Sequence, residues 1–421
     1  MKKIVFILED YHPNYSAVGV CIKNVVEELV RFRDYTITII TLKSDNTQRN
    51  THLNEALIRY VNTNDNYLRN RISEKLKTAR GLRKYILQTE KISVRGYGYI
   101  CAFLGKSNIK KQDVRAFLRE LNKIDDKIDV IIPTCLPFES VLAALEFKKK
   151  SSYEVKVIPF LFDKFSENRT LHRTENNRMK KFKMHLSLEK QMLEECDKVL
   201  FVDSWAEHLQ ANFFSCVDKF CQVEHPLLKR IVSTETVLYD NGRINVVYTG
   251  ALYKKIRSPL HALKLFSRLI EVDKRILLHF YINGDCNSIV NSYCEKYPEN
   301  IINHGSVPTS FAKAAIMNAD LLLSIGNTDI TQLPSKIFEY ISTGKPVAHF
   351  YFNQDDQIIS ILSDYDNSCC IKIDESLLLQ GELNLQELLR NVNKNIDFAE
   401  VQNIFYKATP RFTANKIVDL I

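Results

Sequence analysis

The chain of 421 residues lacks the patterns that mark several common classes of protein. No run approaches the roughly 18 consecutive apolar residues of a membrane-spanning helix. No G-x-G-x-x-G opens a predicted helix, so a dinucleotide-dependent enzyme is not expected. Internal repeats and low-complexity tracts are absent as well. The hydrophobic content of 45% is sufficient for real cores, and the length predicts two domains of ordinary size.

Cysteine is present but carries no recognisable motif. The ten cysteines are scattered, with neither C-x-x-C nor a zinc-finger spacing to histidine. We therefore expect reduced thiols in a cytosolic protein. Cys369 and Cys370 are adjacent, and we interpret them as part of a packed strand, with a redox pair as the alternative. The start, MKKIVFILED, has only a short apolar run and predicts a first strand rather than a signal peptide.

The net charge of +8 is concentrated in one segment. Residues 67–123 contain 15 Lys or Arg against 4 Asp or Glu, a balance of +11, so the remainder carries −3. Basic helices are predicted over 67–91 and 110–123, and 95–105 places aromatic residues beside glycines. This mixture of cations with Tyr, Phe and Leu suits an anionic membrane surface, and a solvated basic face is the alternative. Nucleic acid is not expected, because no binding motif accompanies the charge.

The stretch LLLSIGNTDITQLPSKIFEYISTGKPVAHF, which begins at Leu321, predicts a strand, a polar loop, a helix and a second strand. Pro334 suits the first position of that helix. In open parallel sheets, ligands bind beyond the carboxyl ends of the strands, against helix N-termini. Ser335 and Lys336 would therefore face an anion, and Glu339 could accept hydrogen bonds from a ribose diol. A capped helix with solvated Lys and Glu is the alternative.

Strand and helix patterns alternate along the rest of the chain, which predicts α/β architecture with doubly wound sheets. Strands are expected at 3–8 and 35–42, with a helix between them, and again at 155–162. The polar stretch 229–242 is typical of a linker. A strand at 245–249 then opens the second half of the chain.

These features resemble the donor-binding core of GT-B glycosyltransferases, in particular the retaining group called glycosyltransferase family 4. Members that act in surface-polysaccharide synthesis often have an Asn-containing loop, then P-S-K-x-x-E-Y and G-K-P. This chain matches at Asn327, from Pro334 and from Gly344. The resemblance covers nearly the whole chain and is strongest over 246–350.

The resemblance implies a GT-B fold, with two Rossmann-like doubly wound domains facing a cleft and C-terminal helices crossing back to the first domain. The expected parts are an acceptor-binding domain at 1–226, a nucleotide-sugar-binding domain at 227–395, and terminal helices at 396–421.

The family binds the donor diphosphate through cations in the loop that follows the first strand of the second domain. Lys254, Lys255 and Arg257 match these cations, and three loose surface cations are the alternative. A guanidinium can bridge two phosphate oxygens, so Arg257 is predicted to be catalytic together with Lys336. The predicted donor-binding residues are Gly250, Lys254, Lys255, Asn283, Gly284, Gly305, Val307, Asn327, Pro334, Ser335 and Glu339.

On the acceptor side, the resemblance implies Gly19 in the first loop, with Thr134 and Asp163 at strand ends. Asp163 could instead cap a helix. Two family residues are replaced in this chain. Thr134 and the following Cys stand where a catalytic-site His is common, and Thr331 stands where many members have the first Glu of a pair that contacts the donor sugar.

The resemblance implies transfer of a sugar from a nucleotide-diphosphate donor, with a UDP-sugar preferred, to a lipid-linked or saccharide acceptor, with retention. No metal or cofactor is expected, because cations and helix N-termini neutralise the leaving diphosphate, and no D-x-D ends a predicted strand. The expected location is peripheral, on the inner face of the cell membrane. One alternative is a non-catalytic GT-B partner subunit that binds a saccharide or a sister glycosyltransferase, which the two replaced residues favour. A nucleotide-sugar epimerase of the same fold is a third hypothesis.

Overall fold

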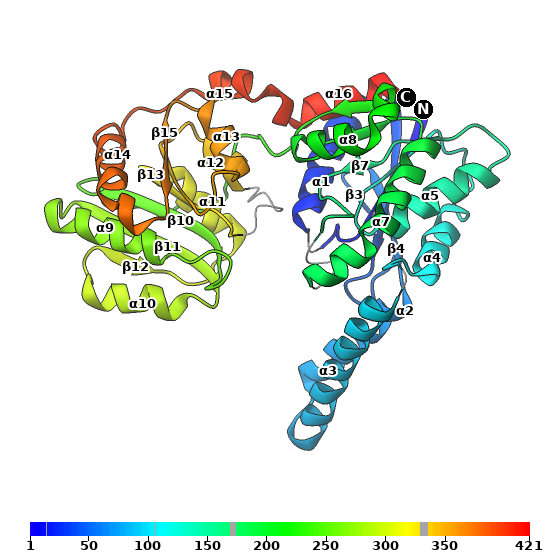
Figure 1. The fold of residues 1–421 in the computed structure, drawn as a ribbon, viewed down its shortest axis with the longest axis horizontal. Coiled ribbons are helices and arrows are strands. Elements are labelled where there is room, and N and C mark those ends of the chain that lie inside the picture. Colours follow the sequence, from blue (N-terminus) through cyan, green and yellow to red (C-terminus); the bar gives the residue numbers. More distant parts are fainter. Residues whose placement is uncertain (14, 106, 169–173, 329–335) are drawn as a thin grey trace. The chain divides into compact units, whose positions relative to one another are not determined.

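The computed structural model describes residues 1–13, 15–105, 107–168, 174–328 and 336–421. It divides into two compact units, each an α/β structure (Figure 1). Unit 1 comprises Met1–Pro226 and Pro410–Ile421, and unit 2 comprises Leu227–Thr409. Among the helices of the described ranges, none is both long and apolar enough to cross a bilayer.

Unit 1 is built on a six-stranded sheet and a smaller three-stranded sheet. Its strands are β1 (Lys2–Leu8), β2 (Tyr35–Leu42), β3 (Thr51–Leu53), β4 (Ala56–Val61), β5 (Val130–Pro133), β6 (Lys156–Val157), β7 (Phe160–Leu161), β8 (Val199–Phe201) and β9 (Phe220–Gln222). The large sheet has the order β3-β4-β2-β1-β5-β6 and is parallel except for the β3–β4 pair. The small sheet is β7-β8-β9. In β1, Ile4 to Leu8 are at most 1% exposed, as expected for a parallel strand covered on both faces.

The strand predicted at 155–162 is wrong as a single element. It forms two short strands, β6 and β7, that belong to different sheets. Pro159 lies between them, and because proline has no backbone N–H it cannot continue a ladder of hydrogen bonds. The carbonyl oxygen of Pro159 instead accepts the N–H of Leu200.

In unit 1, the basic helices predicted over 67–91 and 110–123 form with different limits. The helices of the unit are α1 (Ala17–Arg31), α2 (Asn64–Thr78), α3 (Gly81–Leu104), α4 (Lys111–Leu121), α5 (Phe138–Lys150), α7 (Glu175–Glu195), α8 (Ala206–Phe213) and α16 (Pro410–Leu420), with 3-10 turns at Asp203–Trp205 and Phe214–Lys219. The single basic helix expected over 67–91 is divided between α2 and α3. Helix α3 then continues through Gly96 and Gly98, although each glycine costs about 1 kcal/mol relative to alanine.

Unit 2 contains one six-stranded parallel sheet. Its strands are β10 (Ile244–Leu252), β11 (Ile276–Gly284), β12 (Ile301–Asn303), β13 (Leu321–Ile325), β14 (Val347–Tyr351) and β15 (Ser368–Lys372). The order β12-β11-β10-β13-β14-β15 is 3-2-1-4-5-6 when the strands of the unit are counted along the chain. This is the doubly wound order whose direction reverses between the first and fourth strands, here β10 and β13.

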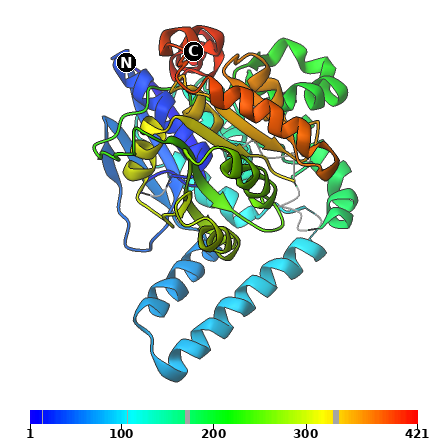
Figure 2. The same cartoon turned by 90° about the vertical axis from the view of Figure 1, so that its left-hand side faces the viewer.

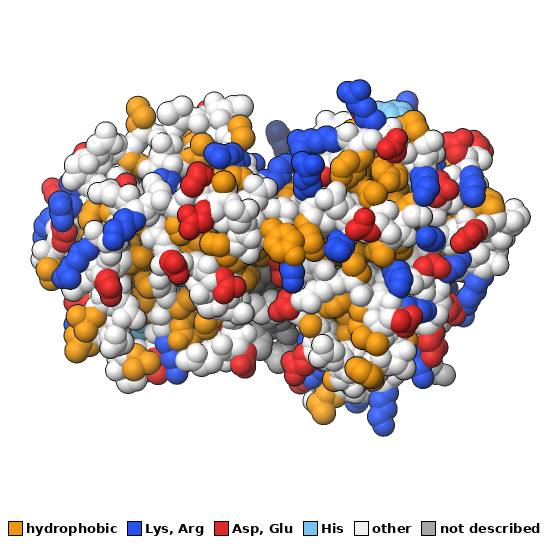
Figure 3. Space-filling view, turned by 90° about the horizontal axis from the view of Figure 1, so that it is seen from above, with side chains coloured by type: hydrophobic (Ala, Val, Ile, Leu, Met, Phe, Trp, Pro, Cys, Tyr) orange, Lys and Arg blue, Asp and Glu red, His pale blue; other side chains and the backbone are white. Residues whose placement is uncertain are grey.

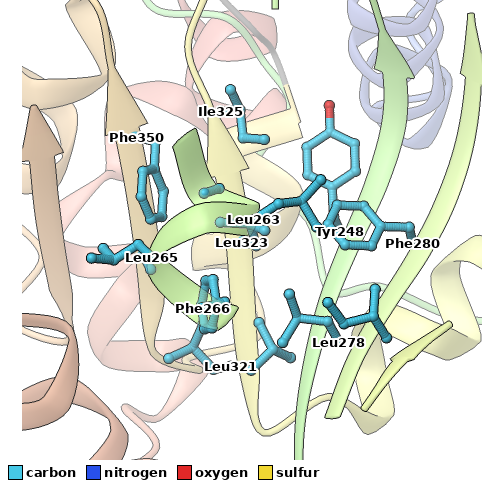
Figure 4. Packing of buried hydrophobic residues seen from close by; sticks show 14 of the residues in the cluster. Tyr248, Leu263, Leu265, Phe266, Leu278, Phe280, Leu321, Leu323, Ile325 and Phe350 are labelled. Atoms are coloured by element: carbon cyan, nitrogen blue, oxygen red, sulfur yellow. The ribbon is translucent and has the colours of Figure 1, made fainter. Parts of the chain in front are cut away.

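Helices cover both faces of this sheet. They are α9 (Leu260–Val272), α10 (Asn287–Lys296), α11 (Thr309–Asn318), α12 (Lys336–Ile341), α13 (Gln357–Ser363), α14 (Leu378–Arg390) and α15 (Phe398–Ile404), with 3-10 turns at Glu375–Leu377 and Tyr406–Ala408. One core cluster joins the sheet to α9, α10 and α14, and the other joins it to α11, α12, α13 and α15. In Figure 4, Phe266 of α9 lies against the strands beside Leu321 and Leu323. Tyr248 and its neighbour Val247 belong to opposite clusters, as the alternation of a strand requires.

The C-terminal segment is shared between the units. Helix α15 lies in unit 2, and the chain returns to unit 1 at Pro410, where α16 packs against α1. The ten cysteines form no disulfide in the structure, and Cys369 and Cys370 lie in β15. The predicted α/β fold with two Rossmann-like units is confirmed.

Candidate functional site

Several predicted donor-site residues of unit 2 gather at the carboxyl ends of β10 and β13, the two strands at which the sheet reverses its order. Gly250 lies near the carboxyl end of β10, Asn327 follows β13, and Lys336 is the first residue of α12. A Cβ placed on Gly250 would lie 3.8 Å from Cδ of Lys336. The structure therefore brings Gly250 and Lys336 together at the point where doubly wound sheets bind their ligands.

Lys336 is held in place by two oxygen atoms. Its Nζ donates to Thr249 Oγ1 at 3.2 Å and to Glu339 Oε2 at 3.3 Å. The side chains of Lys336 and Glu339 remain 41% and 33% exposed. A pair this exposed contributes little to stability. Its consequence is that an accessible ammonium group is fixed beside the end of β10.

Tyr340 is a residue of this site that the predicted set omitted. Its hydroxyl accepts the N–H of Thr249 at 3.1 Å and donates to the carbonyl oxygen of Thr249 at 3.4 Å. Burial raises the pKa of Tyr340 to about 12, so the hydroxyl keeps its proton at neutral pH. These bonds attach α12 to β10 and so position Lys336. The signal in the sequence was the Tyr that ends P-S-K-x-x-E-Y.

Arg257 closes a tight loop after β10. Its N–H donates to the carbonyl oxygen of Tyr253 at 2.8 Å, and its own carbonyl oxygen accepts the N–H of Tyr253 at 3.2 Å. The side-chain Nε donates to Asn327 Oδ1 at 3.0 Å, so two more predicted residues meet. Burial raises the pKa of Tyr248 and of Tyr340, and the charge of Arg257 opposes both shifts. The contact with Asn327 places the Arg257 side chain at the carboxyl end of β13.

The two lysines of the same loop have fixed backbones and exposed side chains. The N–H of Lys254 donates to Asp285 Oδ1 at 2.7 Å. The carbonyl oxygen of Lys255 accepts the hydroxyl of Thr328 at 3.1 Å. The loop is thus attached to the segments that follow β11 and β13, with its cations directed away from the core.

The remaining predicted residues are spread along the same edge of the sheet. Asn283 and Gly284 end β11. Gly284 has φ +103°, and a Cβ there would overlap the carbonyl oxygen of Leu252, so only glycine fits this crossing. Gly305 and Val307 follow β12, which β11 separates from β10.

Three positions of the predicted site, Pro334, Ser335 and the replaced Thr331, lie outside the described residues. Within the described ranges, no group of three or more His, Cys, Asp or Glu side chains is arranged to hold a metal ion.

In unit 1, the three predicted acceptor-side residues occupy different environments. Gly19 lies in the first turn of α1, where a Cβ would overlap the carbonyl oxygen of Asp10. Thr134 is 2% exposed, and its hydroxyl donates to the carbonyl oxygen of Leu136 at 2.9 Å. Asp163 follows β7 and is half-buried; burial raises the pKa of its carboxyl, and the nearby His225 opposes that shift. Their acceptor-side role stays a prediction.

The comparisons with known proteins find likeness in structure alone. No protein-family model matches the sequence, and no curated protein matches it. The structure of sucrose-phosphate synthase from Thermosynechococcus elongatus matches with a TM-score of 0.59 at 11% identity, over 100% of this chain and 98% of that chain. TarM matches with a TM-score of 0.58 at 11% identity, over 100% and 98%. An α,α-trehalose-phosphate synthase (UDP-forming) from Burkholderia vietnamiensis matches with a TM-score of 0.55 at 10% identity, over 100% and 96%.

The fold is GT-B. Both units and the terminal segment are included in these matches, since each covers the whole of this chain. At such low identity the likeness establishes the GT-B fold and leaves the chemistry to the side chains of the site.

Proposed function

We propose that this GT-B protein is a glycosyltransferase, which moves a sugar from a nucleotide-diphosphate donor to a lipid-linked or saccharide acceptor in the synthesis of a surface polysaccharide or glycan. UDP is the nucleotide, the anomeric configuration is retained, and no metal is required. The assignment to the retaining glycosyltransferase family 4 is part of the same proposal.

The observation that carries the proposal is a pair of cations at the β10–β13 switch point. Lys336 comes from α12 and donates to Thr249, which Tyr340 also contacts, and Arg257 comes from the loop after β10 and donates to Asn327, which follows β13. Among the residues that the structure describes, Lys336 forms an ion pair with the carboxylate of Glu339, and Arg257 forms none. A diphosphate leaving group gains negative charge as the glycosidic bond breaks, and fixed cations stabilise that charge without reorganisation.

The ligands bound to two structural neighbours support the choice of UDP. A variant of S. aureus TarM was solved with UDP and α-GlcNAc-glycerol, and its TM-score to this chain is 0.56. MnaA of S. aureus was solved with UDP, with a TM-score of 0.52. The trehalose-phosphate synthase is itself described as UDP-forming.

Incubation with UDP-, GDP- and TDP-sugars tests the proposal directly. We expect nucleoside diphosphate to be released with one UDP-sugar once a glycan or lipid-linked acceptor is present, and NMR of the product should show the donor's anomeric configuration. UDP at about 100 times its dissociation constant should also raise the unfolding free energy by about 2.7 kcal/mol. UDP binding without release with any acceptor would support the partner-subunit alternative. A product that stays linked to the nucleotide would indicate an epimerase.

A fragment of unit 2 tests where the donor binds. Residues 227–409 include Leu228, Val401 and Ala408, which complete the core cluster on the α12 face of the sheet. We expect this fragment to fold and to bind UDP by calorimetry, with an affinity near that of the whole chain, and to have no transferase activity. A folded fragment that does not bind UDP would show that the donor site needs residues of unit 1.

A further inference from the structure

A cavity of about 500 Å³ lies in unit 1, apart from the donor-site residues of unit 2. Its lining comes from the loop 43–50 that joins β2 to β3, from β4, and from the end of α4. After β4 the chain leaves the body of the unit as an arm formed by α2 and α3, and it returns at α4 (Figures 1 and 2). The described residues that line the cavity all lie outside this arm.

The side chains around the cavity are mostly cationic. Among the described residues that line it, Lys43, Arg49, Arg59 and Lys123 are basic, and Glu120 is the one carboxylate. Glu120 forms ion pairs with Arg59 and with Lys123, so a single carboxylate faces four cations. By contrast, the face of the molecule in Figure 3 shows cations and anions interspersed. The cavity therefore favours an anionic ligand.

The guanidinium of Arg59 is only partly satisfied by the protein. Its Nη2 donates to Glu120 Oε2 at 3.5 Å and to the carbonyl oxygen of Lys123 at 3.4 Å, and both distances are long for such bonds. Its Nε is buried and has no hydrogen-bond partner among the described residues. Buried donors without an acceptor are costly and rare in folded proteins. A carboxylate or phosphate group would supply acceptors that match the planar fork of Arg59.

Two other cations of the cavity stand on a loop with a fixed backbone. The carbonyl oxygen of Lys43 accepts Nδ2 of Asn70 at 3.0 Å, and Gln48 Oε1 accepts the N–H of Ser44 at 2.8 Å. Neither Lys43 nor Arg49 forms an ion pair with a carboxylate of the described residues. Because the loop is already ordered, a ligand that binds these two charges loses little affinity to loop ordering.

Neutral hydrogen-bonding groups complete the lining and indicate a ligand with hydroxyls. Gln48 and Asn50 provide amides, and Asn50 is oriented by a bond from the N–H of Tyr60 to its Oδ1 at 3.1 Å. An amide has two donors and an acceptor, so each can bind a sugar hydroxyl as well. The cavity is also within the range of roughly 300–1,000 Å³ that holds small-molecule ligands. Cations beside amides in such a volume suit a sugar segment that carries negative charge.

We propose that this cavity binds the anionic part of a glycan chain, a sugar segment that bears carboxylate or phosphate groups. The inference rests on the proposed sugar transfer and defines the acceptor as an anionic glycan, held at a place in unit 1 outside the donor site. The Tyr60 hydroxyl donates to the carbonyl oxygen of His12 at 3.1 Å. His12 belongs to the loop between β1 and α1, so the cavity is attached to the loop that leads to Gly19, a predicted acceptor-side residue.

Calorimetry of the full chain with three tetrasaccharides tests the inference. We expect tetragalacturonate or phosphorylated maltotetraose to bind roughly ten times more tightly than neutral maltotetraose, and the tighter of the two identifies the anionic group as carboxylate or phosphate. Lys43→Gln with Arg49→Gln should weaken that binding roughly tenfold or more, the loss expected for one charge-assisted hydrogen bond. The control, Arg83→Gln with Lys84→Gln, removes the same two residue types at exposed positions of α3 and should leave binding unchanged.

Arg59→Lys tests the geometry of the site, because lysine keeps the charge and lacks the planar fork. We expect weaker binding of the charged tetrasaccharide and unchanged binding of maltotetraose. Circular dichroism checks that each variant is folded, and the exposed Arg49 can be replaced alone if the Arg59 variant is not. Equal affinity for all three tetrasaccharides would overturn the inference, as would equal loss in the cavity and control pairs.

Two further results would assign the cavity to another ligand and overturn the inference. Inorganic phosphate that binds as tightly as the charged tetrasaccharide would indicate a site for a free ion. Phosphatidylglycerol vesicles that bind through Lys43 and Arg49, while neither charged tetrasaccharide binds, would indicate a membrane surface.

Transfer assays separate this inference from the proposed function. If both hold, the Lys43 and Arg49 variant should raise the KM of a charged acceptor and leave the donor KM unchanged. Binding of a charged tetrasaccharide that this variant weakens, in a protein that releases no nucleoside diphosphate from any donor, would support the cavity and contradict sugar transfer. Transfer to a charged acceptor with an unchanged KM in the variant would overturn the inference and leave the proposed function intact.

Discussion

Replacing Arg257 or Lys336 by Ala is expected to lower turnover by roughly 10- to 150-fold, which corresponds to a lost charge-assisted contact of about 1.5–3 kcal/mol. The physical reason is that, in the proposed reaction, both cations face a diphosphate whose charge grows in the transition state. Binding of the intact donor should weaken less than turnover falls. Steady-state kinetics with a UDP-sugar, together with UDP-sugar affinity by calorimetry, separate the two quantities.

Glu339 provides the contrast within the same site. If its carboxylate holds ribose hydroxyls, the contact is equal in ground and transition states, so Glu339→Gln should raise the donor KM and leave kcat nearly unchanged. Glu339→Gln also removes the negative charge that pairs with Lys336. The Lys336→Ala variant measures the contribution of that lysine separately. Lys407→Ala, an exposed cation of unit 2 away from the site, should keep full activity. Equal loss of kcat in all three site variants would contradict this division of roles.

The second large effect concerns stability and arises in unit 1. His208 joins two carboxylates, with Nε2 2.8 Å from Glu189 Oε2 and Nδ1 3.3 Å from Glu167 Oε1. Glu189 is fully buried and also accepts the N–H and the hydroxyl of Ser166. His208→Ala would leave that carboxylate buried without its cation. We expect the unfolding free energy of unit 1 to fall by about 3–5 kcal/mol.

A second substitution distinguishes the lost charge pair from lost packing. In the His208→Ala background, Glu189→Gln should recover part of the stability, because the buried group is then neutral. His52→Ala, at an exposed position of β3, should change stability by less than about 0.5 kcal/mol. Chemical denaturation of all four proteins provides the comparison. No recovery in the double variant would show that packing around the imidazole, including Trp205, accounts for the loss.

The same cluster predicts a dependence of stability on pH. Burial alone would lower the pKa of His208, but its bonds to Glu167 and Glu189 outweigh burial and raise the pKa to about 9. A raised pKa stabilises the folded state fully below the unfolded value of about 6.5, and that contribution disappears as pH rises through 9. The hydrogen bond with His208 is also the largest of the interactions that lower the pKa of Glu167 to about 2. The stability that this lowered pKa provides is lost only as pH falls through 2. His208→Ala should therefore remove the decrease in stability between pH 6.5 and 9.

Much of the fold was predictable from local patterns. The strand predicted at 35–42 forms with those limits as β2, and the one predicted from Leu321 forms as β13, because short apolar runs bounded by polar residues have few other solutions. The hairpin β3–β4 was missed, since three-residue strands leave little pattern. The predicted strand at 155–162 is divided at Pro159, which has no backbone N–H to donate to a neighbouring strand. That effect becomes visible only when the neighbouring strands are placed.

The sequence by itself determined the element types and the doubly wound architecture, because these follow from periodicity, and its resemblance to GT-B glycosyltransferases indicated the candidate cations. Only the tertiary structure decided which groups meet. The contact of Lys336 with Thr249 spans 87 residues, that of Arg257 with Asn327 spans 70, and the Tyr340 anchor spans 91. The pKa of His208 likewise depends on burial and on carboxylates from two other segments. Such distances and environments arise when parallel strands place their carboxyl ends side by side, and no local pattern in the chain encodes them.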